Sequence, residues 1–531
     1  MSEPTPTRTA RRQRSRRALA SPTSVLLLAA LAGGCATRVP KDELVVLVEA
    51  PATTPDPRFA ISAQDFKLGR LIYAPLVTAD DPSGLPQMVL AERVTPLDDR
   101  RWEVVIRDNA RFSDGRPVEA EDVVWTVRSM LDPATGSRMR QVLTEAGLVD
   151  VVADGPRRVL FTLSKTRAPF VTDLNFGLLA RPRPGEPPPA RGVLPVGAGP
   201  FVFASRSGET WRLVRNPHYL FGAPKIARVT VKTIRDDNSR LLALVGGSGD
   251  LTQNTISPLL VDSVAANRAL RVETGRSSVW SYLGFNCEDP LLADVRVRRA
   301  IAHAIDRARI VRTKLHERGV VATSMLPTFH WAYEPDVDRY DYDPARARAL
   351  LDEAGHPDPD GDGPGVRFTL VYKTSNNRFR VAVASVIAEM LREVGIGVDL
   401  RVTEFATFFA DVKKGNFQMF SMQIPEIVEP DLHTNFFASS RIPRRDNLDA
   451  GGNRMRYRND EVDRLLDEGR ATLDRAERKR IYAQLQRVLA RDLPVLPLWH
   501  EDNVAAMRKE VRGFVVLPTA QLAAVATSWK E

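Results

Sequence analysis

The residues that could carry out covalent chemistry do not complete a catalytic template in this sequence. The run Gly246-Gly247-Ser248-Gly249-Asp250 resembles the turn that presents a nucleophilic serine, but aspartate stands where that turn needs a final glycine. Gly197-Ala198-Gly199-Pro200 could be taken for a nucleotide-binding loop, but Pro200 has no N–H to offer a phosphate. Carboxylates are numerous, yet no spacing rule selects a catalytic pair among them. We therefore expect a protein that is not an enzyme.

Metal-ligating residue types are present, but not at metal-binding spacings. Asp358, Asp360, Asp362 and Gly363 imitate the first half of a calcium loop, whereas the twelfth position is a threonine that cannot supply the bidentate carboxylate. No two histidines stand three or four residues apart, the spacing that places two ligands on one helix face. They are His218, His303, His316, His330, His356, His433 and His500. The sequence predicts neither a protein-built metal site nor a cofactor.

The first 35 residues have the composition of an export signal. Six arginines precede the apolar run 25–32, which is far too short to span a bilayer, and Gly33-Gly34-Cys35 follows it. The ending LAGGC resembles the lipobox of bacterial lipoproteins, in which the cysteine is acylated and becomes the new N-terminus. We expect residues 1–35 to be a lipoprotein signal and Cys35 to carry the lipid. Arg16-Arg17 leaves the Sec and twin-arginine export routes both open.

The net charge of +9 would suit a nucleic-acid-binding protein, but most of it lies in this signal segment. Six arginines and one acid in residues 1–35 account for +5, which leaves +4 on the rest of the chain. Beyond Cys35 no basic run is interleaved with aromatic residues, so we expect no nucleic-acid partner.

If Cys35 carries the lipid, the other cysteine, Cys287, has no disulfide partner. We expect the mature part in the periplasm or at the cell surface, held on a bacterial membrane by its lipid.

Strand and helix patterns alternate along the chain, which predicts an α/β fold. Trp102, Val104 and Ile106 alternate as in a strand, and a helical stripe follows over 123–131. Asp343 is placed to cap a helix over 344–354, and the strongest apolar stripe runs from 383 to 394. The Pro/Gly-rich segment 181–200 predicts a loop or a connection between lobes. These stripes are interpreted as core faces rather than as chemistry.

Several segments, taken together and in order, resemble the oligopeptide-, dipeptide- and nickel-binding class of ABC-transporter solute-binding proteins, also called extracellular solute-binding protein family 5. The resemblance covers essentially the whole mature chain. The matching segments are Pro55-Asp56-Pro57 with LGRLIYAPLV (68–77), RFSDGRPVEAEDVVWTVRSMLDP (111–133), VGAGPFVF (196–203), 215–251, YLGFNCEDPLLADVRVRRAIAHAIDRARIV (282–311), NRMRYRNDEVDRLLDEG (453–469) and LPVLPLWHEDNV (493–504).

The resemblance implies a two-lobed clamshell with an additional subdomain on the first lobe. It places the first lobe at 41–75, 198–285 and 500–531, the additional subdomain at 76–197, and the second lobe at 286–499. The chain would cross between lobes near Asn286 and His500. It also implies a monomeric receptor that closes on a short peptide or peptide-like solute and delivers it to the permease of an ABC importer.

The family pairs a peptide's backbone with strand edges from both lobes, which would be Ile61-Ser62-Ala63 on one side and the run from Ser421 through Met422 and Gln423 to Pro425 on the other. Glu426 stands four residues before Pro430, where peptide-binding members hold the ligand's ammonium with an aspartate. Glu429 or Asp431 could serve instead. Two departures from the pattern count against an unmodified peptide: Met422 replaces the usual aromatic residue, and Pro425 lacks an N–H.

Other ligands and roles stay open at this stage. A nickel chelate, haem or oligosaccharide would make His433, Arg378 or stacking on Trp280 more important than Glu426. A ligand sensor, or a lipoprotein enzyme that kept the fold, would be a different class of protein.

Overall fold

The structure is a computed structural model that describes residues 39–81, 85–361, 363–444, 446, 448 and 451–531. The predicted signal segment with Cys35 lies outside these residues, and so does Asp362 of the acidic turn. Among the described residues, no helix is long and apolar enough to cross a membrane.

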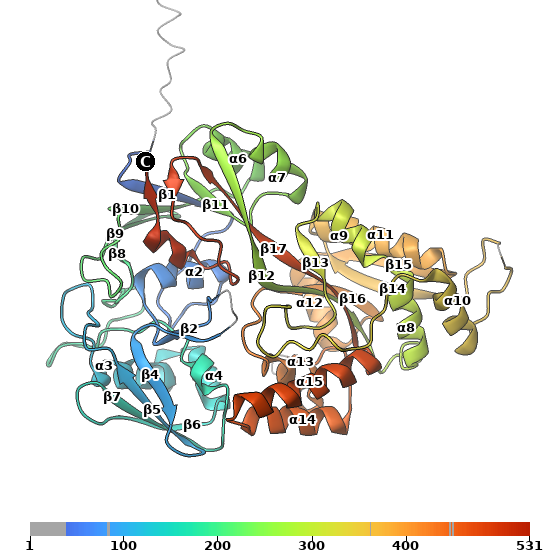
Figure 1. Cartoon of the computed structure of the whole chain (residues 1–531), viewed down its shortest axis with the longest axis horizontal. Coiled ribbons are helices and arrows are strands. Elements are labelled where there is room, and N and C mark those ends of the chain that lie inside the picture. The colour runs from blue at the N-terminus through green and yellow to red at the C-terminus, as the bar shows by residue number, and fades with distance from the viewer. Residues whose placement is uncertain (1–38, 82–84, 362, 445, 447, 449–450) are drawn as a thin grey trace, which may run out of the picture. The chain divides into compact units, whose positions relative to one another are not determined.

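An eleven-stranded mixed sheet runs through the part of the chain beginning at Val39 (Figure 1). Its order is β15-β14-β16-β12-β17-β11-β1-β10-β9-β8, with β13 paired to β17. The strands are β1 (Glu43–Val48), β8 (Phe201–Ser207), β9 (Thr210–Arg215), β10 (Arg228–Thr233), β11 (Leu251–Gln253), β12 (Leu270–Phe285), β13 (Gly319–Val321), β14 (Phe368–Ser375), β15 (Ile396–Thr403), β16 (Met419–Ile424) and β17 (Val495–Arg508).

Two long strands join the halves of this sheet. Strand β12 pairs antiparallel with β17 from Leu270↔Arg508 to Gly284↔Val495, and the register shifts between Arg276 and Trp280. At one end β17 continues the sheet through β11, and at the other end β12 continues it through β16. A register shift marks a local bend and twist, so the ribbon of β12 and β17 is irregular where it passes between the two halves.

The half that contains β1 buries one face of its sheet under helix α2 (Ala63–Ile72). Its core includes Leu44, Leu71, Phe201 and Met507, drawn from four separate segments. The other elements here are α6 (Asp237–Val245), α7 (Pro258–Ala265), β18 (Val511–Arg512), the 3-10 helix η4 (Leu522–Thr527) and β19 (Trp529–Lys530).

A separate four-stranded antiparallel sheet, β4-β5-β7-β6, lies within residues 77–173 and has its own core. The predicted strand around Trp102 is confirmed as β5, and the stripe over 123–131 is confirmed as α3. The elements are β2 (Val77–Thr78), β3 (Gln87–Met88), β4 (Ala91–Pro96), β5 (Arg101–Ile106), α3 (Ala120–Leu131), η2 (Pro133–Thr135), α4 (Met139–Glu145), β6 (Leu148–Ala153), β7 (Arg158–Leu163) and α5 (Phe170–Asp173).

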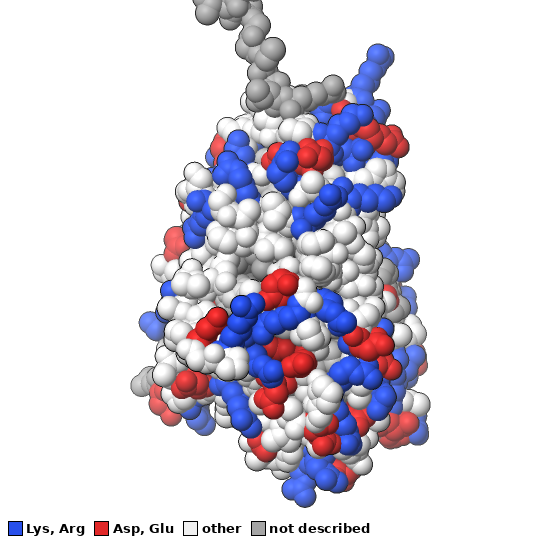
Figure 2. Space-filling view, turned by 90° about the vertical axis from the view of Figure 1, so that its left-hand side faces the viewer, with Lys and Arg blue, Asp and Glu red and all other residues white. Residues whose placement is uncertain are grey.

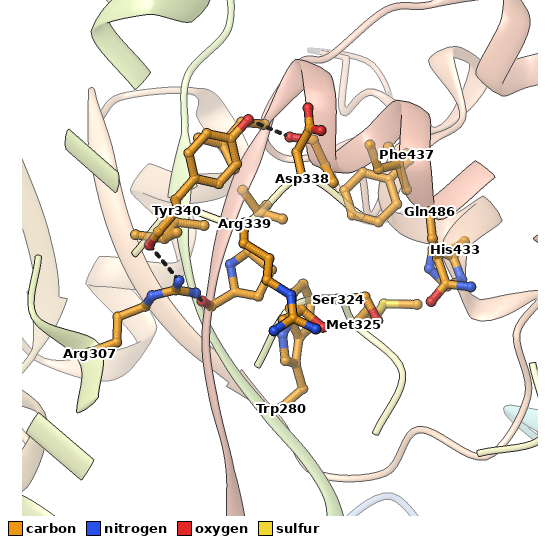
Figure 3. Close-up of a pocket in the computed structure, with 17 residues that line it drawn as sticks. Trp280, Arg307, Ser324, Met325, Asp338, Arg339, Tyr340, His433, Phe437 and Gln486 are labelled. Atoms are coloured by element: carbon orange, nitrogen blue, oxygen red, sulfur yellow. Dashed lines mark hydrogen bonds between the residues drawn. The ribbon is translucent and has the colours of Figure 1, made fainter. Parts of the chain in front are cut away.

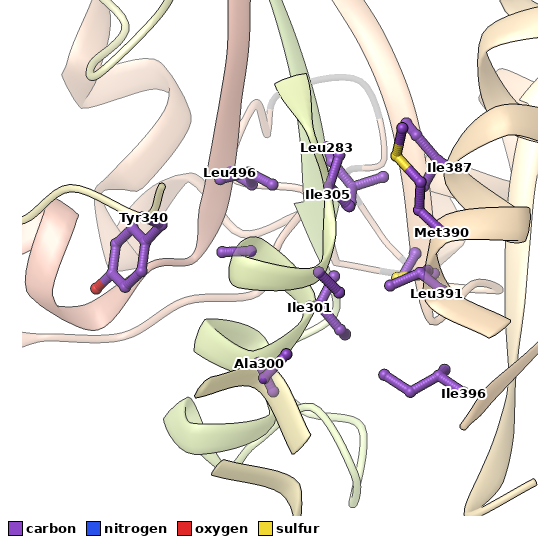
Figure 4. Close-up of a cluster of buried hydrophobic side chains, with 14 of the residues drawn as sticks. Leu283, Ala300, Ile301, Ile305, Tyr340, Ile387, Met390, Leu391, Ile396 and Leu496 are labelled. Atoms are coloured by element: carbon purple, nitrogen blue, oxygen red, sulfur yellow. The ribbon is translucent and has the colours of Figure 1, made fainter. Parts of the chain in front are cut away.

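The half that contains β14 has helices on both faces of its strands (Figure 1). The stripe from 383 to 394 is confirmed as the buried face of α11, where Ile387, Met390 and Leu391 pack with Leu283 and Ile301 (Figure 4). The helices are α8 (Val295–Ala304), α9 (Arg307–Lys314), α10 (Pro344–Glu353), α11 (Arg378–Arg392), α12 (Phe405–Lys414), α13 (Leu432–Phe437), η3 (Ser439–Arg441), α14 (Asp460–Ala471) and α15 (Arg475–Asp492). Asp343 caps α10 as predicted, accepting the N–H of Arg346.

The two loops that resembled catalytic or nucleotide motifs have structural roles. The Asp250 carboxylate accepts the N–H of Val45 at 2.7 Å and pairs with Lys530 at 2.9 Å, which ties β1 to the C-terminus. A Cβ atom at Gly199 would lie 2.4 Å from the carbonyl carbon of Ile72, so only glycine fits this close backbone approach.

Charges of both signs are interspersed on the face shown in Figure 2, which includes the four-stranded sheet. Within the four-stranded sheet, Arg158 pairs with Glu103 at 2.6 Å, and Glu103 also pairs with Arg93 at 2.9 Å. No continuous basic surface for a nucleic-acid backbone is visible on this face.

Candidate functional site

A cavity of about 340 Å³ lies beside the β12–β17 ribbon and is lined by residues from both halves of the long sheet. The segment after β11 provides Asn254, Ile256 and Pro258. The start of α11 provides Asn377 and Arg380 from the opposite half. Its volume falls in the range of small-molecule sites, which run from about 300 to 1,000 Å³.

Glu501 on β17 is the acidic side chain of this cavity that three side-chain donors hold. Its Oε1 atom accepts hydrogen bonds from Gln423 Nε2 at 2.8 Å, Trp499 Nε1 at 3.1 Å and Ser281 Oγ at 3.2 Å. No described residue donates a hydrogen bond to its second oxygen, Oε2. Three donors on one oxygen fix the orientation of the carboxylate, because rotating it would break all three bonds.

Arg380 is the cation of the cavity. It stands in the first turn of α11, and its guanidinium donates to Ser375 Oγ at 3.2 Å. Burial lowers the pKa of Arg380, and the charge of Glu501 acts in the opposite direction. No ion pair within the described residues engages Arg380, so its charge is only partly compensated.

Three of the residues predicted from sequence line this cavity: Ser421, Met422 and Gln423 of β16. The Gln423 side chain helps to hold Glu501, whereas the Met422 side chain packs into the core with Trp280 and Tyr282. Strand β14 pairs with β16 only at Met419 and Phe420, so the rest of that edge of β16 pairs with no strand of the described residues.

The structure differs from the expected strand edge at Ile61-Ser62-Ala63. Ser62 is the N-cap of α2, and its hydroxyl accepts the N–H of Asp65. The Asp65 carboxylate in turn accepts the N–H groups of Ile61 and Ser62, each at 3.1 Å. This capping box ends the extended backbone and starts a helix at Ala63. The local side-chain bonds outcompete strand formation here.

Glu426 lies on the loop after β16 and faces the other half of the molecule. Its charged neighbours are Lys67 and Arg70 of α2 and Asp80, and Gln521 donates a hydrogen bond to it. Burial, followed by the charge of Asp80, raises the pKa of Glu426 to about 6. The structure therefore supplies this carboxylate with two cations of its own.

Trp280 and His433, the residues expected to matter for a metal chelate, haem or sugar, line a different and much smaller cavity of about 30 Å³ (Figure 3). Trp280 is fully buried and stacks on Tyr282 with ring centroids 4.4 Å apart. Burial lowers the pKa of His433 to about 4. A space of this size is about the volume of one water molecule. Arg378 is exposed at the start of α11 and lines neither cavity.

Asp431 and Glu429 are both held by arginines. Asp431 is 8% exposed and receives Arg470 Nε at 3.0 Å and Thr434 Oγ1 at 2.8 Å, with Arg167 3.5 Å away. Glu429 pairs with Arg478. Arg167 follows β7 of the four-stranded sheet, and Arg470 lies on α14. The contacts of both arginines with Asp431 therefore connect the region of the four-stranded sheet to α14.

Because the folded-state pKa of Glu426 lies above its ordinary value of 4.5, its ionisation opposes folding. The stabilising contribution is complete below pH 4.5 and is lost as the pH rises through 6. We expect the stability of the wild type relative to Glu426→Gln to fall by about 2 kcal/mol between pH 4 and pH 8. Urea unfolding of both proteins at the two pH values measures this difference; a constant difference would contradict the partly buried position of Glu426.

Arg380 and Glu501 were not among the residues predicted from sequence. Arg380 lies at the start of α11, where only the apolar stripe was interpreted, as a core face. Glu501 lies in β17, among residues that a sequence pattern assigns to packing. The local signals for a binding role were the position of Arg380 near the start of the predicted helix and the position of Glu501 next to His500, where the chain was predicted to cross between lobes. Which charges share a cavity depends on the pairing of β12, β16 and β17, which no local pattern specifies.

Comparisons with known proteins agree with this architecture. The model of the family described as bacterial extracellular solute-binding proteins, family 5 Middle, matches residues 86–440. The probable D,D-dipeptide-binding periplasmic protein DdpA of Escherichia coli K12 is 30% identical over 90% of this chain and 92% of its own length. Heme-binding protein A of Haemophilus influenzae is 25% identical over 79% of this chain and 78% of its own length.

The oligopeptide-binding protein AppA of Bacillus subtilis is similar in both sequence and structure. Its sequence is 27% identical over 86% of each chain. Its structure in complex with a nonapeptide superimposes with a TM-score of 0.73, covering 92% of this chain and 99% of that one. These similarities confirm the predicted α/β fold of the periplasmic-binding-protein type with an extra subdomain. The chain belongs to family 5 of the bacterial extracellular solute-binding proteins, the non-catalytic receptors that supply solutes to ABC importers.

Proposed function

We propose that this receptor binds a short peptide or peptide-like solute in the cavity beside the β12–β17 ribbon and delivers it to the permease of an ABC importer. The observation that carries the proposal is the lining of that cavity by Asn254–Pro258 on one side and Asn377–Val383 on the other. A ligand that touches both segments would favour the arrangement in which they lie close together.

The lobes in this proposal are 41–75, 198–285 and 500–531 for the first, with 76–197 as its additional subdomain, and 286–499 for the second. Three separate buried cores, around Leu44, Trp102 and Ile301, support three bodies, although Leu283 and Phe285 of the first-lobe range pack into the third core. Ligand-driven movement of one lobe against the other would then centre on the irregular stretch of β12 near Arg276.

Peptide chemistry is supported by the free edge of β16. The backbone groups along Ser421–Ile424 that face away from β12 are open to an extended chain, and a peptide lying there would add a strand to the sheet. Backbone pairing does not read side chains, so such a site accepts varied sequences. The relatives named for oligopeptides and dipeptides are consistent with this ligand class.

The test is to incubate the part of the mature chain that follows the lipidated cysteine, residues 36–531, with a library of peptides two to nine residues long. After rapid desalting, retained ligand is identified by mass spectrometry. We expect retention of peptides at a stoichiometry near one per protein. Retention of a metal chelate, a haem or a sugar from a matched mixture, with no peptide retained, would overturn the proposal.

Lipid anchoring through Cys35 is the second part of the proposed function. Replacing Cys35 by alanine removes the thiol that the lipobox requires, so we expect the variant to lack labelled fatty acid and, if its signal is cleaved elsewhere, to leave the membrane fraction. Cys287→Ala is the matched control, because it removes the other cysteine and leaves the signal intact. Fatty-acid labelling of Cys35→Ala at the wild-type level would contradict the assignment.

A further inference from the structure

The long sheet carries exposed cations at one of its ends. They are Lys41, Lys225, Arg268 and Lys509, and we call them the basic end. We propose that the basic end docks on an anionic lipid bilayer and so sets how the receptor stands on its membrane. The inference goes beyond solute binding, and it rests on the proposed lipid anchor at Cys35.

Two of these cations stand at the start of parallel strands. Strand β1 pairs with β10 in parallel, beginning at Glu43↔Arg228. Lys41 comes shortly before β1, and Lys225 comes shortly before β10. Because paired parallel strands run in the same direction, the residues that precede them lie beyond the same edge of the sheet. The register therefore brings Lys41 and Lys225 to one edge.

The other two cations stand at the same end of an antiparallel pair. Strand β12 begins and β17 ends at the pair Leu270↔Arg508. Arg268 comes just before β12 and Lys509 comes just after β17, so both lie beyond the same edge. Strand β11 links the two pairs, because it runs parallel to β1 and antiparallel to β17. All four cations therefore lie at one end of the sheet.

The acidic side chains near the basic end are paired with other cations. The C-terminus belongs to this end too, beside β1 (Figure 1). The pairs are Asp42 and Glu43 with Arg228, Asp250 with Lys530, Glu510 with Arg508 and Glu531 with Arg512. No ion pair within the described residues engages the four cations of the basic end, and Lys225 Nζ lies 4.2 Å from the centre of the Trp529 ring. An excess of positive charge therefore faces solvent here.

The proposed anchor is attached close to the basic end. Val39 packs against the buried cluster that contains Leu270, and the carbonyl of Pro40 accepts Lys530 Nζ at 3.1 Å. From Cys35 to Val39 the chain has four residue steps, which span about 14 Å at most. Charged headgroups act on a protein over about 10 Å at ordinary ionic strength. A lipid on Cys35 would therefore hold the basic end close to the headgroups.

A bilayer surface fits the basic end better than a small anion does. The four cations come from the ends of four strands, and none of them lines either cavity described above. Positive charge that is spread over a surface, without a pocket, attracts many anionic headgroups at once. A lipid chain combined with a cluster of basic residues is also the two-part arrangement that holds proteins stably on membranes.

The first experiment uses residues 36–531, which lack the lipid, with vesicles of phosphatidylcholine alone or of equal parts phosphatidylcholine and phosphatidylglycerol. Cosedimentation at low salt should occur with the anionic vesicles and be lost at high salt. The double variant Lys225→Gln/Lys509→Gln should bind about fivefold more weakly for each lysine removed. Lys414→Gln/Lys479→Gln is the matched control, because it removes two exposed lysines of α12 and α15, and it should bind like the wild type.

The second experiment uses the lipidated protein, either reconstituted in the anionic vesicles or kept in detergent. A brief pulse of an acetylating reagent marks accessible lysines, and mass spectrometry identifies the modified positions. Lys41, Lys225 and Lys509 should react more slowly on the vesicles than in detergent. Lys414 and Lys479 should react alike in both. Circular dichroism melting confirms that the variants of the vesicle experiment are folded.

The outcomes separate the docking surface from the anchor. If Cys35 is acylated but the three lysines of the basic end react equally on vesicles and in detergent, the surface is overturned and the anchor stands. If Cys35 is not acylated but the lipid-free protein binds anionic vesicles through these lysines, the anchor fails and the surface stands. Equal binding to neutral vesicles, or protection only in membranes that contain the permease, would assign this end to another contact and overturn the inference.

Discussion

Replacing Asp431 by asparagine should lower the unfolding free energy of the mature protein by about 3–5 kcal/mol. The carboxylate is 8% exposed and holds Arg470 by two contacts, at 3.0 and 3.3 Å, with Arg167 at 3.5 Å. Asparagine keeps the size of the side chain but leaves the two guanidinium groups without this charge in a desolvated place. Urea denaturation followed by circular dichroism measures the loss.

Asp399→Asn provides the matched control, because Asp399 pairs with Arg401 on the surface and both side chains are about half exposed. Its loss should be at most about 1 kcal/mol. Asp431 was also a candidate for the ligand's ammonium group, and the two roles predict different results. An Asp431→Asn protein with wild-type stability and weakened peptide binding would show that the arginine network is dispensable.

Replacing Arg298 by methionine should cost about 4 kcal/mol or more. Arg298 is buried at the start of α8, and its guanidinium donates to the backbone carbonyls of Leu493 at 3.0 Å, Leu292 at 2.6 Å, Ala293 at 3.0 Å and Asp492. Methionine keeps the apolar stem but leaves these carbonyls without donors. Leu493 has a positive φ of 47°, so the turn that Arg298 supports is strained as well.

Arg312→Met on the exposed side of α9 is the comparison for Arg298→Met. It removes an arginine without a hydrogen bond to any described residue and should change stability by less than about 0.5 kcal/mol. Equal losses for the two variants in urea denaturation would mean that the four carbonyls find other donors, contrary to the structure.

Much of the fold could be predicted because local chemistry and final structure agree. The Asp343 cap, the α11 stripe and the strand around Trp102 each appear in the structure as predicted, but residues 102–106 are all buried and do not alternate with exposed positions. The segment 61–63 could not be predicted correctly by position alone, since a serine and an aspartate three residues apart form a capping box there. Ser62 and Asp65 are the local signal in the sequence for this helix start.

The charged residues show the limit of sequence reasoning most clearly. Glu426, Glu429 and Asp431 are acidic residues of one short segment, and the sequence alone does not distinguish them. In the structure each has different cations nearby: Glu426 has Lys67 and Arg70, Glu429 has Arg478, and Asp431 has Arg470. Those partners lie about 40 to 360 positions away along the chain. Such distant contacts decide which carboxylate has an oxygen that accepts no hydrogen bond. The role of Glu501 could therefore be recognised only once the pairing of its strand with the neighbouring strands was known.

The most direct test of the receptor site is hydrogen–deuterium exchange of the mature protein with and without the peptide retained from the library. Amide exchange reports local opening, and a ligand that joins two segments slows exchange in both. Binding in the cavity beside β12 and β17 predicts slower exchange in 254–258, 377–383 and 421–424 together. Protection confined to other segments, with these three unchanged, would contradict the site and the function built on it.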